Sequence, residues 1–146
     1  MTRQLPDVNV LVALLWPRLE SHIEARAWFA KSGNTGWATN PLTQLGVLRL
    51  LTNPGIVQAA VSPADAVSAL SKLTSHAGHE FWPLNRGMAT SLQPFVSMIK
   101  GYKQWTDVVL LGQTVEHEGV LVTFDAGIKE FAGGKLAQYV HRLKSR

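Results

Sequence analysis

Three aspartates stand beside the most apolar segments of the sequence, and their type and placement point to metal chemistry. Asp7 precedes the run "VNVLVALLW", Asp107 opens "TDVVLLGQTV", and Asp125 ends "LVTF". Carboxylates that are brought together repel one another, so such a group needs a cation, shared protons or bound water. Hard oxygen ligands with no His or Cys among them favour Mg²⁺ or Mn²⁺ over zinc. If the three lie together, they predict an acidic site for one of these two ions.

Each aspartate also has a purely structural explanation. Asp7 and Asp107 could cap helices or interact with the helix dipole. Asp125, which precedes Ala-Gly, could simply form a turn. These explanations hold one residue at a time, and the metal site gains weight only if the fold brings all three aspartates to one place.

The elements that must position these residues alternate between strand and helix patterns. The segment 88–102 is a weaker helix because Pro94 interrupts it, and the residues directly after Asp125 are expected to form a turn. Strand patterns cover residues 2–7, 35–40, 79–85, 120–124 and 137–143. Helix patterns cover residues 9–16, 19–33, 41–52, 64–78 and 106–119. The alternation predicts an α/β fold in which helices flank a central, doubly wound parallel sheet of about five strands.

In this fold the three aspartates converge. Functional groups of an open parallel sheet collect just beyond the carboxyl ends of the strands. Asp7 follows the first strand and Asp125 follows the fourth. Asp107 lies in the first turn of a helix, and the N-terminus of that helix is expected at the same edge of the sheet.

Length and composition set limits on the class of protein. The 146 residues suit one domain spanning 1–146, and 46% hydrophobic residues with only 16% charged residues argue against disorder. The absence of cysteine excludes disulfides, thiolate zinc sites and cysteine nucleophiles. No segment has the length of a membrane span or the form of a secretion signal, so we expect a soluble, cytoplasmic protein. A net charge of +4 fits a polyanionic partner.

Four stretches, in order, resemble the PIN-domain ribonucleases, and most of all the VapC-type toxins of type II toxin–antitoxin pairs. They are "PDVNVLVAL", "ATNPLTQLGVLRLLTNP", "WTDVVLLGQTVEHEGVLVTFD" and "DAGI", and they span residues 6–128. The resemblance implies one PIN-like domain and an endoribonuclease that hydrolyses RNA phosphodiester bonds with Mg²⁺ or Mn²⁺. It also implies a VapB-like antitoxin that blocks the acidic cleft, and a homodimer.

The family's acidic residues fall on Asp7, Asp107 and Asp125, which the resemblance makes the metal ligands. The position after Thr43, where the family usually carries glutamate, is Gln44. An amide contributes one neutral carbonyl oxygen, so the site loses a negative charge and a general base there. Gln44 would then orient a water of the ion's hydration shell.

Several neighbouring residues are candidates for supporting roles. Asn9 and Thr106 could donate hydrogen bonds that hold the carboxylates, although helix capping explains them equally well. Glu116 and Glu118 lie roughly 13–17 Å beyond Asp107 along a helix, too far to replace the missing acid. His76, His79 and Glu80 flank a glycine and present no fixed ligand face. The five tryptophans are expected in the core or at an interface rather than as platforms on which RNA bases stack, and the basic tail 141–146 is a candidate for RNA contact.

Two alternatives remain open from the sequence. Gln44 could mark a catalytically weakened PIN-like module that only binds RNA or an antitoxin. A phosphatase resembling the haloacid dehalogenases could use Asp7 as its nucleophile, but the residue two positions later is Asn9 rather than the aspartate that would protonate the leaving group. Metal-dependent cleavage of RNA separates the first alternative from a ribonuclease.

Overall fold

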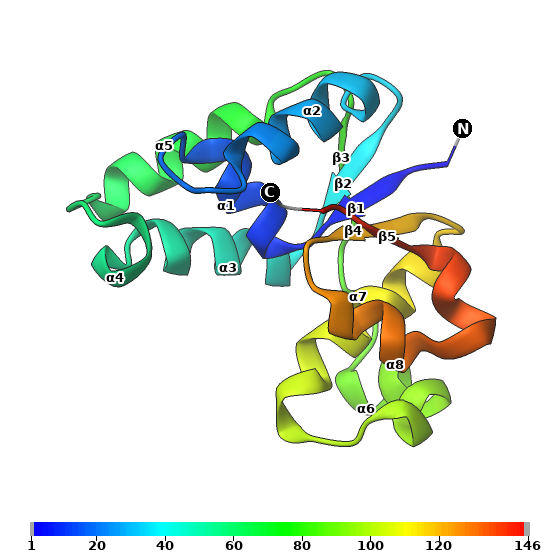
Figure 1. Cartoon of the computed structure of the whole chain (residues 1–146). Coiled ribbons are helices and arrows are strands. Elements are labelled where there is room, and N and C mark those ends of the chain that lie inside the picture. Colours follow the sequence, from blue (N-terminus) through cyan, green and yellow to red (C-terminus); the bar gives the residue numbers. More distant parts are fainter. Residues whose placement is uncertain (1, 145–146) are drawn as a thin grey trace.

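The predicted parallel sheet is present in the structure, a computed structural model that describes residues 2–144 (Figure 1). All pairings between neighbouring strands are parallel, and the strand order is β3-β2-β1-β4-β5. The strands are β1 (Gln4–Pro6), β2 (Trp37–Thr39), β3 (His79–Phe81), β4 (Val120–Thr123) and β5 (Val140–Arg142).

Helices cover both faces of this sheet, as a doubly wound fold requires. In Figure 1, α1 to α5 form one layer and α6 to α8 form the other. The first layer contains α1 (Val8–Leu15), α2 (His22–Ser32), α3 (Pro41–Leu51), α4 (Pro54–Val57) and α5 (Pro63–Thr74). The second contains α6 (Met88–Leu92), α7 (Trp105–Glu116) and α8 (Ala126–Leu136), with the 3₁₀ turns η1 (Gln93–Met98), η2 (Tyr102–Gln104) and η3 (Ala137–Tyr139).

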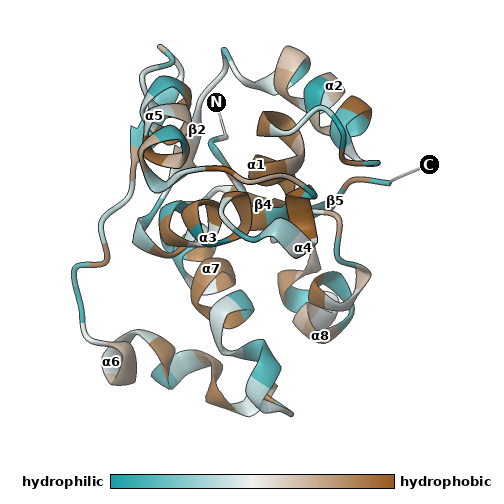
Figure 2. Cartoon of the chain, turned by 90° about the vertical axis from the view of Figure 1, so that its left-hand side faces the viewer, coloured by the Kyte–Doolittle hydropathy of each residue, from teal (hydrophilic) through white to brown (hydrophobic). Residues whose placement is uncertain are grey.

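The strands separate two apolar cores because successive side chains point to opposite faces of a sheet. Trp37 and Val122 pack into the core beneath α1, α2, α3 and α5. Their neighbours Ala38 and Leu121 pack into the core beneath α7 and α8. The hydropathy colours in Figure 2 show apolar residues along α1, α3 and α7. Of these helices, α1 and α7 pack against the central strands β1 and β4. The near-continuous apolar strands are therefore explained by burial on both faces.

Most predicted elements are confirmed, including the caps at Asn40 and Ser62, whose side chains accept hydrogen bonds from the first turns of α3 and α5. The interruption at Pro94 is also confirmed, since α6 ends at Leu92 and continues only as the turn η1. The short helix α4 was not predicted. The last two residues of the basic tail, 145–146, lie outside the described residues.

The expectation of a simple turn after Asp125 is wrong, because helix α8 begins there. Its glycines, Gly127, Gly133 and Gly134, lower its intrinsic helix propensity and hide it from a sequence pattern. Gly133, with a positive φ of 69°, also kinks the helix near its end. Tertiary packing overrides that propensity: Ile128 and Ala132, one helical turn apart, are both buried against the sheet.

The strand order places a topological switch point at β1. From β1 the chain moves outward to β2 and β3, and it later returns to the other side of β1 to form β4 and β5. Ligands of open α/β sheets bind outside the carboxyl ends of the strands at such a point. Asp7 is the residue that directly follows β1. Within residues 2–144, no helix combines the length and apolar composition that crossing a membrane requires.

Candidate active site

Asp7 is the most firmly held of the three aspartates. It caps α1, is only 8% exposed, and accepts hydrogen bonds at both carboxylate oxygens. Oδ1 accepts from the backbone N–H of Val8 at 2.7 Å, and Oδ2 accepts from the Thr123 hydroxyl at 3.0 Å. Burial raises the pKa of Asp7 and the charge of Asp125 adds to this, while the two hydrogen bonds oppose them. The structure thus fixes the direction of this carboxylate before anything binds.

Asp125 is held in the same region as Asp7, because it also bonds to the hydroxyl of Thr123. Its backbone N–H donates to Thr123 Oγ1 at 3.0 Å, and its own exposed carboxylate caps α8 by accepting from the N–H of Gly127 at 2.8 Å. One threonine at the end of β4 therefore joins the first and last aspartates. Thr123 was missed in the sequence, where the only signal is a hydroxyl residue at a strand end, two positions before an acid.

Asp107 differs from the other two, since its side chain makes no hydrogen bond within the described residues. It is the third residue of α7 and is half-buried. Burial, and after it the charges of Asp7 and Asp125, together raise its pKa to about 6. Capping, the structural explanation for Asp7, is therefore confirmed, and Asp125 caps a helix where only a turn was expected. Asp107 caps no helix, but it lies in the first turn of α7, where a carboxylate interacts favourably with the helix dipole.

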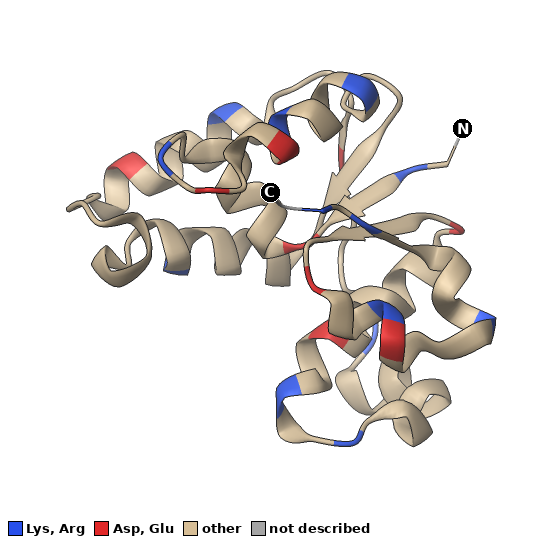
Figure 3. Cartoon of the chain, in the orientation of Figure 1, with Lys and Arg blue, Asp and Glu red and all other residues tan. Residues whose placement is uncertain are grey.

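The mutual electrostatic effects show that the three carboxylates share one region. Each of the pairs Asp7–Asp125, Asp7–Asp107 and Asp107–Asp125 is close enough to shift a pKa. Figure 3 shows acidic segments where α1, α7 and α8 begin, next to the strand ends. In the described part of the chain, however, no three His, Cys, Asp or Glu side chains are arranged to hold one ion together. Mg²⁺ keeps several waters and binds through one or two carboxylates, so this donor set suits it without a closed cage.

Gln44 lies in the first turn of α3, at the same edge of the sheet. Its amide nitrogen Nε2 donates to the hydroxyl of Thr39, the last residue of β2, at 2.9 Å. Its carbonyl oxygen has no hydrogen-bond partner within residues 2–144. The structure therefore gives one end of this amide a defined partner and leaves the other end available.

The side chains of Asn9 and Thr106 make no hydrogen bond in the described structure, so their support of the carboxylates stays a prediction. Both are exposed and line a groove of about 360 Å³ between α1, α3 and α7. Arg49 and Asn53 add polar groups to this groove, and its remaining lining is mostly apolar. Asn9 and Thr106 lie within two residues of Asp7 and Asp107 in the sequence, but none of the three aspartates lines this groove.

A buried polar network, also missed in the sequence, ties the two sides of the site together. The side chain of Asn40 caps α3 and donates from Nδ2 to Oε1 of Gln113 at 2.6 Å. Gln113 Nε2 in turn donates to the carbonyl oxygens of Trp82 at 3.3 Å and Pro83 at 3.1 Å. Because Gln113 belongs to α7, this network fixes the start of α3 relative to the helix that carries Asp107.

The other polar clusters of the sequence have structural partners. Glu116 pairs with Arg86 at 2.7 Å on the surface, and Glu118 is exposed, as expected. Glu80 pairs with Arg3 at 2.6 Å, and His76 Nδ1 accepts from the N–H of Gly78. These contacts account for both regions without a metal.

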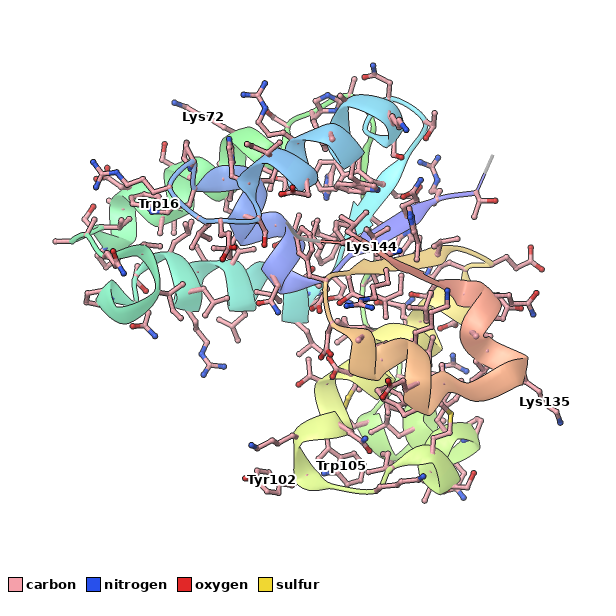
Figure 4. The ribbon with its side chains drawn as sticks, viewed as in Figure 1. Trp16, Lys72, Tyr102, Trp105, Lys135 and Lys144 are labelled. Atoms are coloured by element: carbon pink, nitrogen blue, oxygen red, sulfur yellow. The ribbon has the colours of Figure 1, made fainter. Side chains whose placement is uncertain are left out.

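The tryptophans divide between the core and the surface. Trp28, Trp37 and Trp82 are buried in the cores, but Trp105 is 48% exposed. Figure 4 places Trp105 near the exposed Tyr102, at the far end of the layer that contains α6 and α7. Trp105 lines a second groove, of about 570 Å³ and largely apolar, that shares Leu42 and Thr106 with the first groove. One tryptophan is thus available to a ligand beside the acidic site.

Comparison with known proteins decides the family. The model of the PIN domain matches residues 5–134, nearly the whole chain. The chain belongs to the PIN-domain family. This membership agrees with the sheet and with the three acids at the switch point, and it decides against the phosphatase alternative.

Relatives within the PIN family carry the resemblance further. Ribonuclease VapC39 of Mycobacterium tuberculosis is 36% identical over 134 residues, which cover 92% of this chain and 96% of that protein. Ribonuclease VapC38 of the same organism is 40% identical over 124 residues, covering 85% and 86%. The resemblance to VapC-type ribonucleases is therefore confirmed.

One solved structure has the same fold. It is VapBC2 from Rickettsia felis bound to a DNA fragment from their promoter. The TM-score is 0.63 at 15% sequence identity, and the match covers 96% of this chain and 98% of that chain. At this identity the match supports the PIN fold and nothing finer.

Proposed function

We propose that this PIN-domain protein is a metal-dependent endoribonuclease that hydrolyses RNA phosphodiester bonds as the cytoplasmic toxin of a toxin–antitoxin pair. The observation that carries the proposal is the electrostatic coupling of Asp7, Asp107 and Asp125, which come from three separate elements and meet at the switch point of the sheet. The relatives named as VapC ribonucleases supply the reaction class.

Asp7, Asp107 and Asp125 are the residues that would hold Mg²⁺ or Mn²⁺. When bound, the ion would polarise the scissile phosphate and lower the pKa of a water. Asp7 supplies a preoriented carboxylate, because Val8 and Thr123 fix both of its oxygens. Asp107 supplies a carboxylate that burial and neighbouring charge destabilise. A cation relieves that repulsion, so the energy of crowding the acids favours metal binding.

The RNA chain needs positive charge outside the acidic cluster. Arg49 lines the groove beside the acids, and Lys144 follows β5 at the same edge of the sheet. The pairing of Thr123 with Arg142 places Lys144 level with Asp125 along the two strands. Lys103, Lys129 and Lys135 are further candidates, of which Lys135 projects from the end of α8 in Figure 4. Asn9 and Thr106 offer hydrogen bonds to sugar or phosphate oxygens in the groove.

The antitoxin is proposed to occupy the same region. A VapB-like partner would place an Arg or Lys among the three carboxylates, where charge-assisted hydrogen bonds are strong. This insertion would block the metal and the RNA together. We also propose a homodimer, by analogy with the family.

Cleavage of single-stranded RNA under metal titration tests the function. We expect no cleavage in EDTA, and cleavage that rises with added Mg²⁺ or Mn²⁺ and is absent in Asp107→Asn. A protein that binds RNA but cleaves none at any metal concentration would instead be the catalytically weakened module that Gln44 allows.

A further inference from the structure

A chain of hydrogen bonds runs from Gln44 into the sheet. The hydroxyl of Thr39, which is fully buried at the end of β2, has two side-chain partners. Gln44 Nε2 lies 2.9 Å from Thr39 Oγ1, and His79 Nε2 lies 2.7 Å from it. His79 is the first residue of β3, the strand paired with β2. The chain therefore links the first turn of α3 to two neighbouring strands.

The direction of this chain is fixed by the number of available protons. An amide nitrogen only donates, so Thr39 accepts from Gln44 and has its single proton left for His79 Nε2. That nitrogen must then be unprotonated. His79 also has a hydrogen bond with the backbone of Thr74. Because Nε2 faces Thr39, we assign this bond to the other ring nitrogen, Nδ1, which then carries the proton and donates it. Every donor and acceptor is matched if the imidazole is neutral.

The surroundings of His79 favour this neutral form. Burial lowers its pKa, and His76 acts in the same direction, while the Thr74 hydrogen bond and the charge of Glu80 oppose them. Glu80 is already paired with Arg3 at 2.6 Å, which weakens its effect on His79. If the Gln44 amide were reversed, its oxygen would face Thr39 and the Thr39 hydroxyl would donate to it. His79 Nε2 would then have to donate to Thr39, so both ring nitrogens would carry protons. The imidazole would be positively charged, and burial disfavours that charge.

We propose that Thr39 and His79 are positioning residues of the site: they hold the Gln44 amide with its nitrogen toward the sheet and leave its carbonyl oxygen to orient a water or substrate oxygen. The proposal rests on the proposed ribonuclease function for its role, but not for its geometry. It also explains why a glutamine fits position 44 of this chain. A carboxylate cannot donate to Thr39, so in Gln44→Glu the Thr39 hydroxyl would donate to the carboxylate. The direction of the hydrogen bonds would be reversed, and His79 Nε2 would need a proton.

Titration of His79 by NMR tests the geometry without any activity measurement. The His79 signal is identified by its loss in His79→Gln. In the parent protein we expect a pKa below the ordinary value of 6.5. In Gln44→Glu we expect it to rise above that value, because the carboxylate turns the Thr39 hydroxyl into an acceptor from His79. An unchanged His79 pKa in Gln44→Glu would overturn the proposal, whether or not the protein cleaves RNA.

Kinetics of Thr39 variants test the positioning role. Thr39→Val keeps the volume and removes the hydroxyl; we expect kcat for RNA cleavage to fall about two- to tenfold, as for one lost neutral hydrogen bond, with KM unchanged. Thr39→Ser should restore kcat. Thr114→Val is the matched control, because Thr114 is equally buried but bonds only to Leu110 of its own helix. Equal rates in Thr39→Val and the parent would refute the positioning role of Thr39, and so would a reduced rate that Thr39→Ser does not restore. If Thr39→Val does not fold, the His79 titration in Gln44→Glu decides.

Discussion

The strand side and the helix side of the site are built differently. On the strand side, Asp7 is held by Val8 and Thr123, and Gln44 is held by Thr39. On the helix side, the Asp107 side chain has no hydrogen-bond partner in the described structure. The segment that leads to it ends in the exposed side chains of Tyr102 and Trp105, at 80% and 48% exposure.

This difference separates two tasks that a phosphodiesterase site must perform. Groups fixed by buried hydrogen bonds keep their geometry without an ion, which is the preorganisation that stabilises charge in a transition state. A carboxylate without hydrogen-bond partners is instead destabilised by the neighbouring negative charges, so a bound cation stabilises it most. We infer that the strand side sets the geometry and that the helix side supplies most of the drive for ligand binding.

The largest expected effect does not distinguish the two sides. Asp7→Asn and Asp107→Asn should each lower RNA cleavage by about 100- to 1,000-fold or more, since each removes a charge from the ion. Initial rates at saturating Mn²⁺ measure this. Asp65→Asn is the control, because Asp65 is an exposed acid in the first turn of α5, away from the strand ends. Parent-like rates in both site variants would remove the acidic site from the mechanism.

The salt dependence of RNA affinity shows whether the RNA binds along the strand side or the helix side of the site. If about three phosphates are neutralised, RNA affinity should fall roughly 10- to 20-fold between 50 and 200 mM salt. Lys144→Gln changes the strand side and Lys103→Gln the helix side, and loss of one phosphate contact should reduce the slope by about 0.7. A smaller slope in one variant alone locates the RNA. A salt-independent affinity in the parent would contradict binding through the phosphates.

The fold could be predicted to this extent because its signals are local. Asn40-Pro41 and Ser62-Pro63 indicate helix starts. The apolar strands can be identified from their own residues, without knowledge of the strands they pair with. Helix α8 escaped because its stability depends on Ile128 and Ala132 packing on the sheet, while its glycines argue against a helix. Propensity is a weak prior wherever tertiary packing decides.

The site could be predicted only as far as its acids. Their convergence follows from topology, which the strand–helix alternation determines. Thr123, the Thr39–His79 contact and the Asn40–Gln113 pair could not be found in the same way, because each connects elements that are distant in the sequence. Gln113, for example, lies 73 residues from its partner Asn40. Such contacts depend on the register and depth of packing, and a single sequence does not encode these locally.

Proton competition at Asp107 gives the next prediction. Its pKa of about 6 means that the carboxyl holds a proton below that pH and is charged above it. Metal must displace this proton, so Mn²⁺ affinity should fall about tenfold between pH 7 and pH 5. Calorimetric titration at both pH values measures the change. Asp107→Asn should bind more weakly at pH 7 with a smaller dependence on pH; an unaltered pH dependence in this variant would assign the proton to another group.

The smallest predicted effect is a change in the free energy of unfolding. Its sign is expected to differ between Asp107→Asn on the helix side and Asp7→Asn on the strand side. The folded state raises the pKa of Asp107 from 3.8 to about 6, so it binds the proton more tightly than the unfolded chain does. The stability that this proton provides is complete below pH 3.8 and is lost as the pH rises through about 6. Without divalent ions, Asp107→Asn should therefore stabilise the protein at pH 7.5, by about 1 kcal/mol after solvent screening, and leave it unchanged near pH 3.5.

Asp7→Asn should act in the opposite direction at pH 7.5. Asparagine has one acceptor oxygen where Asp7 uses two, so either the N–H of Val8 or the hydroxyl of Thr123 loses its partner. The loss of a partner for a buried donor costs about 1–3 kcal/mol. We expect this cost to exceed the combined relief of burial and of repulsion from Asp125, the two effects that raise the pKa of Asp7. Urea unfolding in EDTA at the two pH values measures both variants. Shifts of the same sign would mean that Asp7 and Asp107 are held alike, and the contrast between an anchored strand side and an open helix side would fail.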